Sequence, residues 1–229
     1  MHDLPLLSIV LPCYNEEAIL EPNCRKILSY LESISGRYKW EIVIINDGSK
    51  DKTGDIADHI AATTSNVRVI HHPINLNLGH AIQTGIRNSK GEIIVVLDVD
   101  LSYSETYIGQ LSDKLIEQSA DIVIASPYMK GGKVTAVPLM RGVMSRVVNM
   151  FMRIAAQDRY YTFTSMVRAY RSSFIKNVNL KTRDYEINPE IIYKAMILRA
   201  RIVEIPAHLD WTEQNKFKGK RTSSIRVIR

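Results

Sequence analysis

The chain has 229 residues, of which 45% are hydrophobic and 24% charged, and these proportions indicate a folded domain and exclude a disordered chain. The formal net charge of +6 suits an anionic partner: a nucleotide, a phosphate, a nucleic acid or a membrane surface. The two cysteines, Cys13 and Cys24, form no CxxC motif, so we expect reduced thiols and a protein of the cytosolic side. We expect neither a signal peptide nor a spanning helix, because no apolar run approaches the roughly 20 residues that a span requires.

Short runs rich in β-branched residues alternate with helical patterns along the first half of the chain. Several of these runs are apolar throughout, as in strands that are buried on both faces of a parallel sheet. The expected strands span residues 7–11, 41–45, 67–70, 93–97 and 121–125, and the expected helices residues 17–33, 52–63, 80–89 and 105–119. This alternation predicts an α/β fold with a doubly wound, mostly parallel sheet flanked by helices. In such sheets a ligand lies at the carboxyl ends of the strands.

The alternation ends after Ala125. A flexible basic loop at residues 130–133 precedes a long helix, which we expect at residues 138–156. The remaining expected elements are a strand at residues 164–170, a helix at 189–199 and a strand at 202–205. We therefore predict one domain over residues 1–213 and a basic tail over residues 214–229, which leads toward membrane segments beyond Arg229.

Polar clusters follow the first, second and fourth expected strands, and another precedes the third helix. The cluster after the fourth strand contains Asp98 and Asp100. These residues lie two positions apart, so their carboxylates point to the same side of an extended chain. Two carboxylates this close repel each other unless a cation lies near them. Mg²⁺ or Mn²⁺ shared with a phosphate is the natural occupant of such oxygen ligands. The alternative is that the two aspartates cap the next helix.

The other clusters admit both ligand-binding and structural interpretations. The carboxylate of Asp47 can accept hydrogen bonds from a nucleobase or ribose, or it can end a turn and cap a helix. Tyr14 can stack on a base, and Pro12 can shape the turn around it. Gly79 allows a close backbone approach, or it simply starts a helix.

Taken together, the order and spacing of residues 9–16, 46–53, 78–81 and 97–102 resemble those of family 2 glycosyltransferases. The resemblance covers roughly residues 7–210, and it is closest to the branch that makes polyprenyl- or dolichyl-phosphate mannose or glucose. It implies a GT-A fold, an inverting transfer from a nucleotide sugar and Mn²⁺ or Mg²⁺ as the cofactor. It also favours GDP-mannose as the donor, with UDP-glucose second.

The resemblance implies roles for individual residues as well. We assign nucleotide-sugar binding to Pro12, Tyr14, Glu16, Asp47, Gly79 and Asp98, and metal binding to Asp98 and Asp100. Arg141 and Ser145 match positions that hold the acceptor phosphate, and Arg168 follows a serine-rich segment like that of the family. We expect these three to bind the acceptor, and a guanidinium suits phosphate because it can donate to two oxygens.

Two departures from the branch concern the acceptor and the metal. Pro127 stands where the branch usually has arginine, which removes an expected phosphate contact, and Ser102 stands where a stronger oxygen ligand is usual. A lipid phosphate is already an anion and needs no base, so catalysis would rest on Asp100 and Arg141. A sugar hydroxyl does need a base, and we expect Glu186 to supply it. The alternative for Glu186 is a cap on the following helix.

We therefore expect a metal-dependent glycosyltransferase that moves a hexose, with mannose favoured, to a polyprenyl or dolichyl phosphate. Pro127 favours the alternative, extension of a lipid-linked glycan or polysaccharide at a sugar hydroxyl. The intact pair Asp98 and Asp100 argues against a binding protein without turnover. A nicotinamide-dependent enzyme is disfavoured because no GxGxxG follows the first strand. Nucleic acid is not an expected partner, because no zinc pattern and no basic–aromatic stripe is present.

The expected location is the cytoplasmic face of a membrane. There the helix at residues 138–156 would lie in the interface and the basic tail would meet anionic lipid. The alternatives are a helix that packs in the core and a solvated tail.

Overall fold

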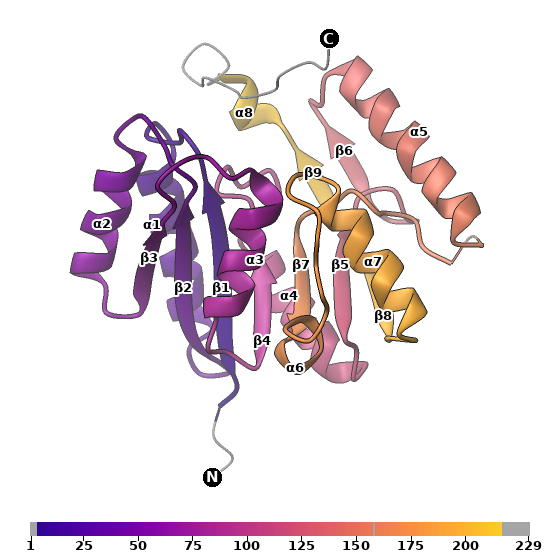
Figure 1. Ribbon diagram of the computed structural model, residues 1–229, viewed down its shortest axis with the longest axis horizontal. Helices are drawn as coiled ribbons and strands as arrows, with labels where there is room; N and C mark the ends of the chain where they lie inside the picture. Colours follow the sequence, from indigo (N-terminus) through magenta and orange to yellow (C-terminus); the bar gives the residue numbers. More distant parts are fainter. Residues whose placement is uncertain (1–3, 158, 217–229) are drawn as a thin grey trace.

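A seven-stranded sheet with helices on both faces forms the centre of the computed structural model, which describes residues 4–157 and 159–216 (Figure 1). The strand order is β3-β2-β1-β4-β7-β5-β8, and every neighbouring pair is parallel except the two that involve β7. The strands are β1 (Leu6–Cys13), β2 (Lys39–Asn46), β3 (Val67–His71), β4 (Ile93–Val96), β5 (Ile122–Ser126), β7 (Arg168–Arg171) and β8 (Ile202–Pro206). In the described residues, a smaller sheet pairs β6 (Lys133–Thr135) in parallel with β9 (His208–Asp210).

Two apolar clusters lie on opposite faces of the large sheet. In β1, Leu7, Ile9 and Leu11 face one cluster and Val10 faces the other, because successive side chains of a strand point to opposite faces. The first cluster is covered by α1 (Leu20–Ser33), α2 (Thr53–Thr63) and α4 (Tyr107–Glu117). The second is covered by α3 (Leu78–Asn88), α6 (Ser172–Ile175) and α7 (Ile187–Ile197), and Figure 1 shows α3 and α7 in front of the sheet. Both faces are thus buried, as the continuous apolar strands predict.

Helix α5 (Leu139–Ala155) lies at the outer side of the molecule, beside β6 (Figure 1). Its one strongly buried polar side chain among those described is Asn149, which is 4% exposed. Most of its large apolar side chains are exposed: Leu139, Met140, Val143, Met144, Val147, Val148, Met150, Phe151 and Ile154. The alternative that this helix packs in the core is therefore wrong for most of its apolar stripe.

The α/β fold and every expected strand and helix are confirmed, with ends that differ by a few residues. The antiparallel direction of β7 was not expected, and the strand is shorter than residues 164–170. The expected flexible loop at residues 130–133 runs directly into β6. Helix α8 (Thr212–Lys216) was not expected either, and it crosses the expected boundary after residue 213. Most of the basic tail, residues 217–229, lies outside the described residues.

Two expectations from composition can also be compared with the structure. Cys13 and Cys24 are both buried and free, as expected of reduced thiols. Of the helices in the described ranges, none combines the length and the apolar character needed to cross a bilayer.

Candidate functional site

The loops that follow β1 and β2 are tied to each other by side-chain hydrogen bonds. The backbone N–H of Asn15 donates to Oγ of Ser49 (3.0 Å), and the N–H of Lys50 donates back to Oδ1 of Asn15 (2.8 Å). The N–H of Glu16 donates to Oγ1 of Thr53 at 2.7 Å. Asn15 has a φ of 55°, a left-handed conformation that asparagine tolerates better than most residues. These bonds hold residues 12–16, the expected nucleotide-binding turn, in one shape beside Asp47.

Asp47 directly follows β2 at the carboxyl edge of the sheet and is only 3% exposed. Its N–H donates to the carbonyl oxygen of Cys13 at 2.8 Å, so its position relative to β1 is fixed. Its Oδ1 lies 2.6 Å from Nδ1 of His72 and accepts the N–H of Leu76 at 3.0 Å. His72 was not identified from the sequence. The sequence did contain one signal for it: His72 directly follows the third strand, just as the other polar clusters follow theirs.

Gly79 lies in the first turn of α3 and is buried. A Cβ at this position would lie 2.6 Å from the carbonyl carbon of Arg183, so the glycine lets α3 approach the chain at residues 183–184. In the described residues, Gly79 therefore approaches the protein backbone closely. A role of Gly79 in donor binding stays a prediction.

Asp98 and Asp100 follow β4 and are both partly exposed. The N–H of Leu101, which has a φ of 51°, donates to the carbonyl oxygen of Asp98 (3.1 Å) and so folds the chain into a turn. Oδ1 of Asp100 accepts the N–H of Ser102 at 2.9 Å, and Oδ2 accepts Nε2 of Gln214 at 2.5 Å. Helix α4 begins only at Tyr107, so the aspartates do not cap it.

The side chains of Asp98 and Asp100 suit a hard divalent cation. Hard oxygen donors at the mouth of a sheet suit Mg²⁺ or Mn²⁺, which often take their other ligands from substrate phosphates and water. Within the described ranges, no three side chains of His, Cys, Asp or Glu gather to form a complete protein cage. The carboxylate oxygens of Asp98 and Asp100 suit a metal whose other ligands come from a phosphorylated substrate, and metal binding at this pair stays a prediction.

Tyr103 lies near both Asp98 and Tyr128, and Tyr128 lies at the carboxyl end of strand β5. Burial, and then the nearby Asp98 carboxylate, raise the pKa of the Tyr103 hydroxyl well above its usual range, so it stays protonated. Tyr128 comes after β5 and donates from its hydroxyl to Oγ of Ser145 on α5, at 2.9 Å. Ser145, an expected acceptor-binding residue, thus lies on the β5 side of the site.

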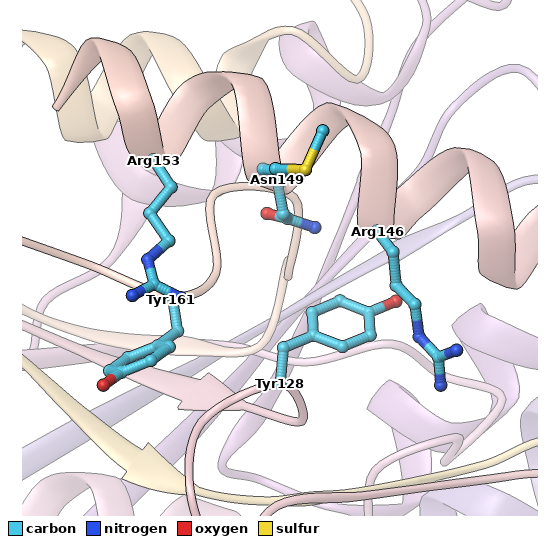
Figure 2. Close-up of a pocket in the computed structure, with 6 residues that line it drawn as sticks. Tyr128, Arg146, Asn149, Arg153 and Tyr161 are labelled. Atoms are coloured by element: carbon cyan, nitrogen blue, oxygen red, sulfur yellow. The ribbon is translucent and has the colours of Figure 1, made fainter. Parts of the chain in front are cut away.

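A cavity of about 260 Å³ lies between α5 and the chain around Tyr128 and Tyr161 (Figure 2). Figure 2 shows Arg146 and Arg153 extending from α5 on either side of Asn149. The guanidinium of Arg153 lies 4.5 Å from the centroid of the Tyr161 ring, in a cation–π contact. Arginine, tyrosine and asparagine side chains are donors, so this cavity can receive an anion.

Asn149 fixes α5 to the chain that leads into β7. Its Nδ2 donates to Oγ1 of Thr164 (2.9 Å), and its Oδ1 accepts the N–H of Phe163 (2.6 Å). Arg141 lies one turn before Ser145 on the same helix. The backbone thus puts both expected acceptor-binding residues of α5 on the helix that walls the cavity.

Arg168, the third expected acceptor-binding residue, is completely buried in β7. Its guanidinium donates to the carbonyl oxygens of Asn188 (2.8 Å) and Phe163 (2.7 Å). Burial lowers the pKa of Arg168, although the neighbouring Tyr170 opposes this effect. In this conformation the side chain has no exposed surface for an acceptor and instead joins β7 to α7. Arg168 is therefore not part of the acceptor site proposed below.

Glu186 stands directly before α7 and is exposed. Its side chain makes no capping hydrogen bond to that helix, so the capping alternative is not what is formed. A carboxylate in this position is accessible to a base role, which stays a prediction.

The profile of glycosyl transferase family 2 matches residues 8–199. The chain belongs to this family. A dolichyl-phosphate beta-glucosyltransferase of Trichomonas vaginalis is 29% identical to this family 2 chain, over 96% of the chain and 70% of that protein. A dolichol-phosphate mannosyltransferase of Pyrococcus furiosus is also 29% identical, over 93% of the chain and 60% of that protein.

Solved structures agree on the fold of this family 2 glycosyltransferase. Glucosyl-3-phosphoglycerate synthase from Mycobacterium tuberculosis, in complex with Mn²⁺, uridine diphosphate and phosphoglyceric acid, superposes with a TM-score of 0.67. The alignment covers 90% of this chain and 69% of that one, at 18% identity, which shows the fold alone. The expected GT-A fold and the expected glycosyltransferase family are thus confirmed. This chain is an enzyme, a glycosyltransferase that depends on a nucleotide sugar.

Proposed function

We propose that this enzyme moves a hexose from a nucleotide sugar to the phosphate of a polyprenyl or dolichyl phosphate. The observation that carries the proposal is the order of groups along the carboxyl edge of the sheet. Asp47 follows β2, Asp98 and Asp100 follow β4, and Tyr128 with its cavity follows β5, in the strand order β2-β1-β4-β7-β5. A nucleotide, its diphosphate and an acceptor anion would occupy these three places in turn. The names of the two relatives, which cover both glucosyl and mannosyl transfer, support the acceptor class.

The proposed chemistry follows from the charges. When the sugar leaves the diphosphate, negative charge develops on the leaving phosphate, and a divalent cation at Asp98 and Asp100 would neutralise it. The acceptor phosphate is already an anion, so no base is needed. Arg141 and Ser145 on α5 are proposed to hold that phosphate, and Arg146 and Arg153 add positive charge nearby.

Extension of a lipid-linked glycan remains the second candidate. Pro127 has no guanidinium to offer an acceptor phosphate, and it is buried directly after β5. A hydroxyl acceptor would need a base, and the exposed Glu186 is the residue proposed for it.

We further propose that α5 binds the surface of a membrane. Leu139 and Met140 are 84% and 78% exposed, and Phe151 and Ile154 are 63% and 65% exposed. An exposed apolar helix face with arginines at its flank is typical of helices that lie in the lipid interface. Binding of α5 to the membrane would bring the acceptor cavity to the lipid headgroups. It supports the expected location on the cytoplasmic face, where nucleotide sugars are supplied.

Transfer from a panel of donors tests the proposal. The purified protein would be incubated with Mn²⁺ and with GDP-mannose, UDP-glucose and related sugars, with and without a short polyprenyl phosphate. We expect metal-dependent transfer of one sugar to the lipid phosphate, with a loss of at least about a hundredfold in Asp98→Asn and Asp100→Asn. Asp113→Asn is the matched control, because Asp113 binds Arg37 on the outer surface. Donor binding without transfer to the lipid phosphate would favour the glycan acceptor, and no donor binding would refute the proposal.

A further inference from the structure

Two adjacent histidines at the end of β3 each hold one of the two polar residues at the end of β2. Nδ1 of His71 lies 2.9 Å from Nδ2 of Asn46, and Nδ1 of His72 lies 2.6 Å from Oδ1 of Asp47. The strands pair in parallel with Asn46 opposite His71, and the N–H of His72 donates to the carbonyl oxygen of Asn46 at 2.9 Å. The register of β2 and β3 therefore fixes which histidine meets which partner.

The imidazole of His72 is itself held in place. It is 9% exposed, and its Nε2 lies 2.9 Å from Oγ1 of Thr84 on α3. The tautomer with a proton on Nδ1 donates to Asp47 and accepts the hydroxyl proton of Thr84 at Nε2. The ring thus acts as a fixed donor to one carboxylate oxygen.

Both hydrogen bonds that the described residues give to the Asp47 carboxylate go to the same oxygen. Oδ1 receives Nδ1–H of His72 and the N–H of Leu76 (3.0 Å), which are roughly the two bonds that one carboxylate oxygen accepts well. Rotation of the carboxylate would break both bonds in a nearly buried place, where unmade hydrogen bonds are costly. Oδ2 is therefore the one oxygen that Asp47 can offer to a ligand.

We propose that His72 makes Asp47 a one-oxygen acceptor, and that the enzyme for this reason selects a uridine over a guanosine nucleotide. This rests on the proposed function and deepens it, because it names the base of the donor. Uracil presents a single N–H, at N3, between two carbonyl groups. Guanine presents two neighbouring donors, N1–H and the N2 amino group, which match the two oxygens of a free carboxylate.

A guanine at this site would leave one of its two donors without a carboxylate oxygen. A site that hydrogen-bonds its ligand discriminates strongly when a buried polar group remains unpaired. A uracil leaves no such donor, because its single N–H meets Oδ2. The structure thus favours a UDP-sugar, the second-ranked donor of the sequence analysis, over GDP-mannose.

Equilibrium binding of nucleotides tests the inference without turnover. The affinities of UDP and GDP would be measured by calorimetry on the purified chain with Mn²⁺. We expect UDP to bind about tenfold or more tightly than GDP, as one unpaired donor predicts. In His72→Leu, Oδ1 keeps only the N–H of Leu76 and can accept a second donor from guanine, so the preference should fall to about threefold or less. His71→Leu, the matched control, keeps the wild-type ratio. Thr84→Val frees the ring without removing it and should give an intermediate ratio, so it serves if His72→Leu does not fold.

The outcomes separate this inference from the function on which it rests. Binding of neither nucleotide refutes the proposed function. Equal binding, or tighter binding of GDP by the wild-type protein, refutes the selection of uridine while the glycosyl transfer stands. A uridine preference that survives unchanged in both His72→Leu and Thr84→Val shows that His72 does not produce it.

Discussion

The side-chain amide of Gln214 donates a hydrogen bond to Oδ2 of Asp100, although the two residues lie 114 positions apart in the chain. Because Oδ1 of Asp100 accepts the N–H of Ser102, both carboxylate oxygens already have a donor. Gln214 is 7% exposed on the short helix α8, and a cavity of about 510 Å³ beside it includes both side chains in its wall. A cation that binds Asp100 must therefore compete with the amide of Gln214.

Gln214→Leu should strengthen the binding of Mn²⁺, because the metal then has no N–H to displace from Oδ2. A hydrogen bond to a charged group contributes about 1.5–3 kcal/mol, so we expect a gain in affinity of at least about tenfold. Mn²⁺ binding in the presence of UDP, followed by electron paramagnetic resonance, measures this. Gln118→Leu is the matched control, because Gln118 contacts Arg201 on the surface. Weaker binding in Gln214→Leu would instead show that the amide turns its oxygen to the metal and serves as a ligand.

The contact between Gln214 and Asp100 also marks the limit of what the sequence predicts. The strands and helices of the first half follow from local patterns, because β-branched apolar runs and capping residues act over a few positions. The direction of β7 does not, since the strand pattern at residues 164–170 is the same for a parallel and an antiparallel strand. Helix α8 has five residues and was too short to show a period.

The candidate site likewise has residues that local sequence patterns predict and residues that they do not. Asp47, Asp98 and Asp100 were found because each stands where a buried strand ends, and the topology brings such positions to one edge. His72 was missed because its partner is set by the register of β2 and β3, which no local pattern records. Arg168 looked like an anion-binding residue by its type. Its burial is fixed by the strands on either side, β4 and β5, which the sequence did not identify as neighbours.

The proposed membrane surface of α5 predicts that its apolar side chains are required for binding to lipid. Met144→Glu and Phe151→Glu should each lower binding to anionic vesicles about tenfold or more, because each removes a large apolar group and adds a charge that the interface disfavours. Cosedimentation with vesicles of phosphatidylcholine and phosphatidylserine measures this. Ile116→Glu, at a 48% exposed position of α4, is the matched control. Vesicle binding that is equal in all variants would contradict a membrane role of α5.

Glu190 predicts a dependence of stability on pH. Burial raises the pKa of its carboxyl, but hydrogen bonds from Lys194, from the Thr182 hydroxyl and from the N–H groups of Thr182 and Lys181 outweigh burial and lower the pKa to about 2. A carboxyl whose pKa is depressed by folding stabilises the protein above its unfolded pKa of about 4.5. That contribution is lost as the pH falls from about 4.5 toward about 2. Glu190→Gln should therefore lower the midpoint of thermal unfolding at pH 7, with a smaller difference from wild type at pH 3.

The control for this prediction is Glu117→Gln, because Glu117 forms an exposed ion pair with Lys114 on α4. Surface pairs of this kind contribute little to stability, so its melting temperature should stay near that of wild type across the range. A difference between Glu190→Gln and wild type that is constant from pH 7 to pH 3 would show that the carboxylate charge is not the cause.

The close packing of Gly79 against the segment that carries Arg183 and Glu186 predicts that a side chain at position 79 destabilises the protein. In Gly79→Ala the new Cβ would meet the carbonyl carbon of Arg183 at 2.6 Å and its oxygen at 2.8 Å, and backbone atoms cannot yield as a flexible side chain does. We expect a loss of about 1–3 kcal/mol in the free energy of unfolding, as for other overpacked sites. Gly36→Ala is the matched control, because no atom lies within 4 Å of its added Cβ. Chemical denaturation of both variants measures the difference, and equal stability would show that residues 183–184 move aside at no cost. In that case the close approach of α3 to this segment would not explain the glycine, and contact with the donor would become the better account of it.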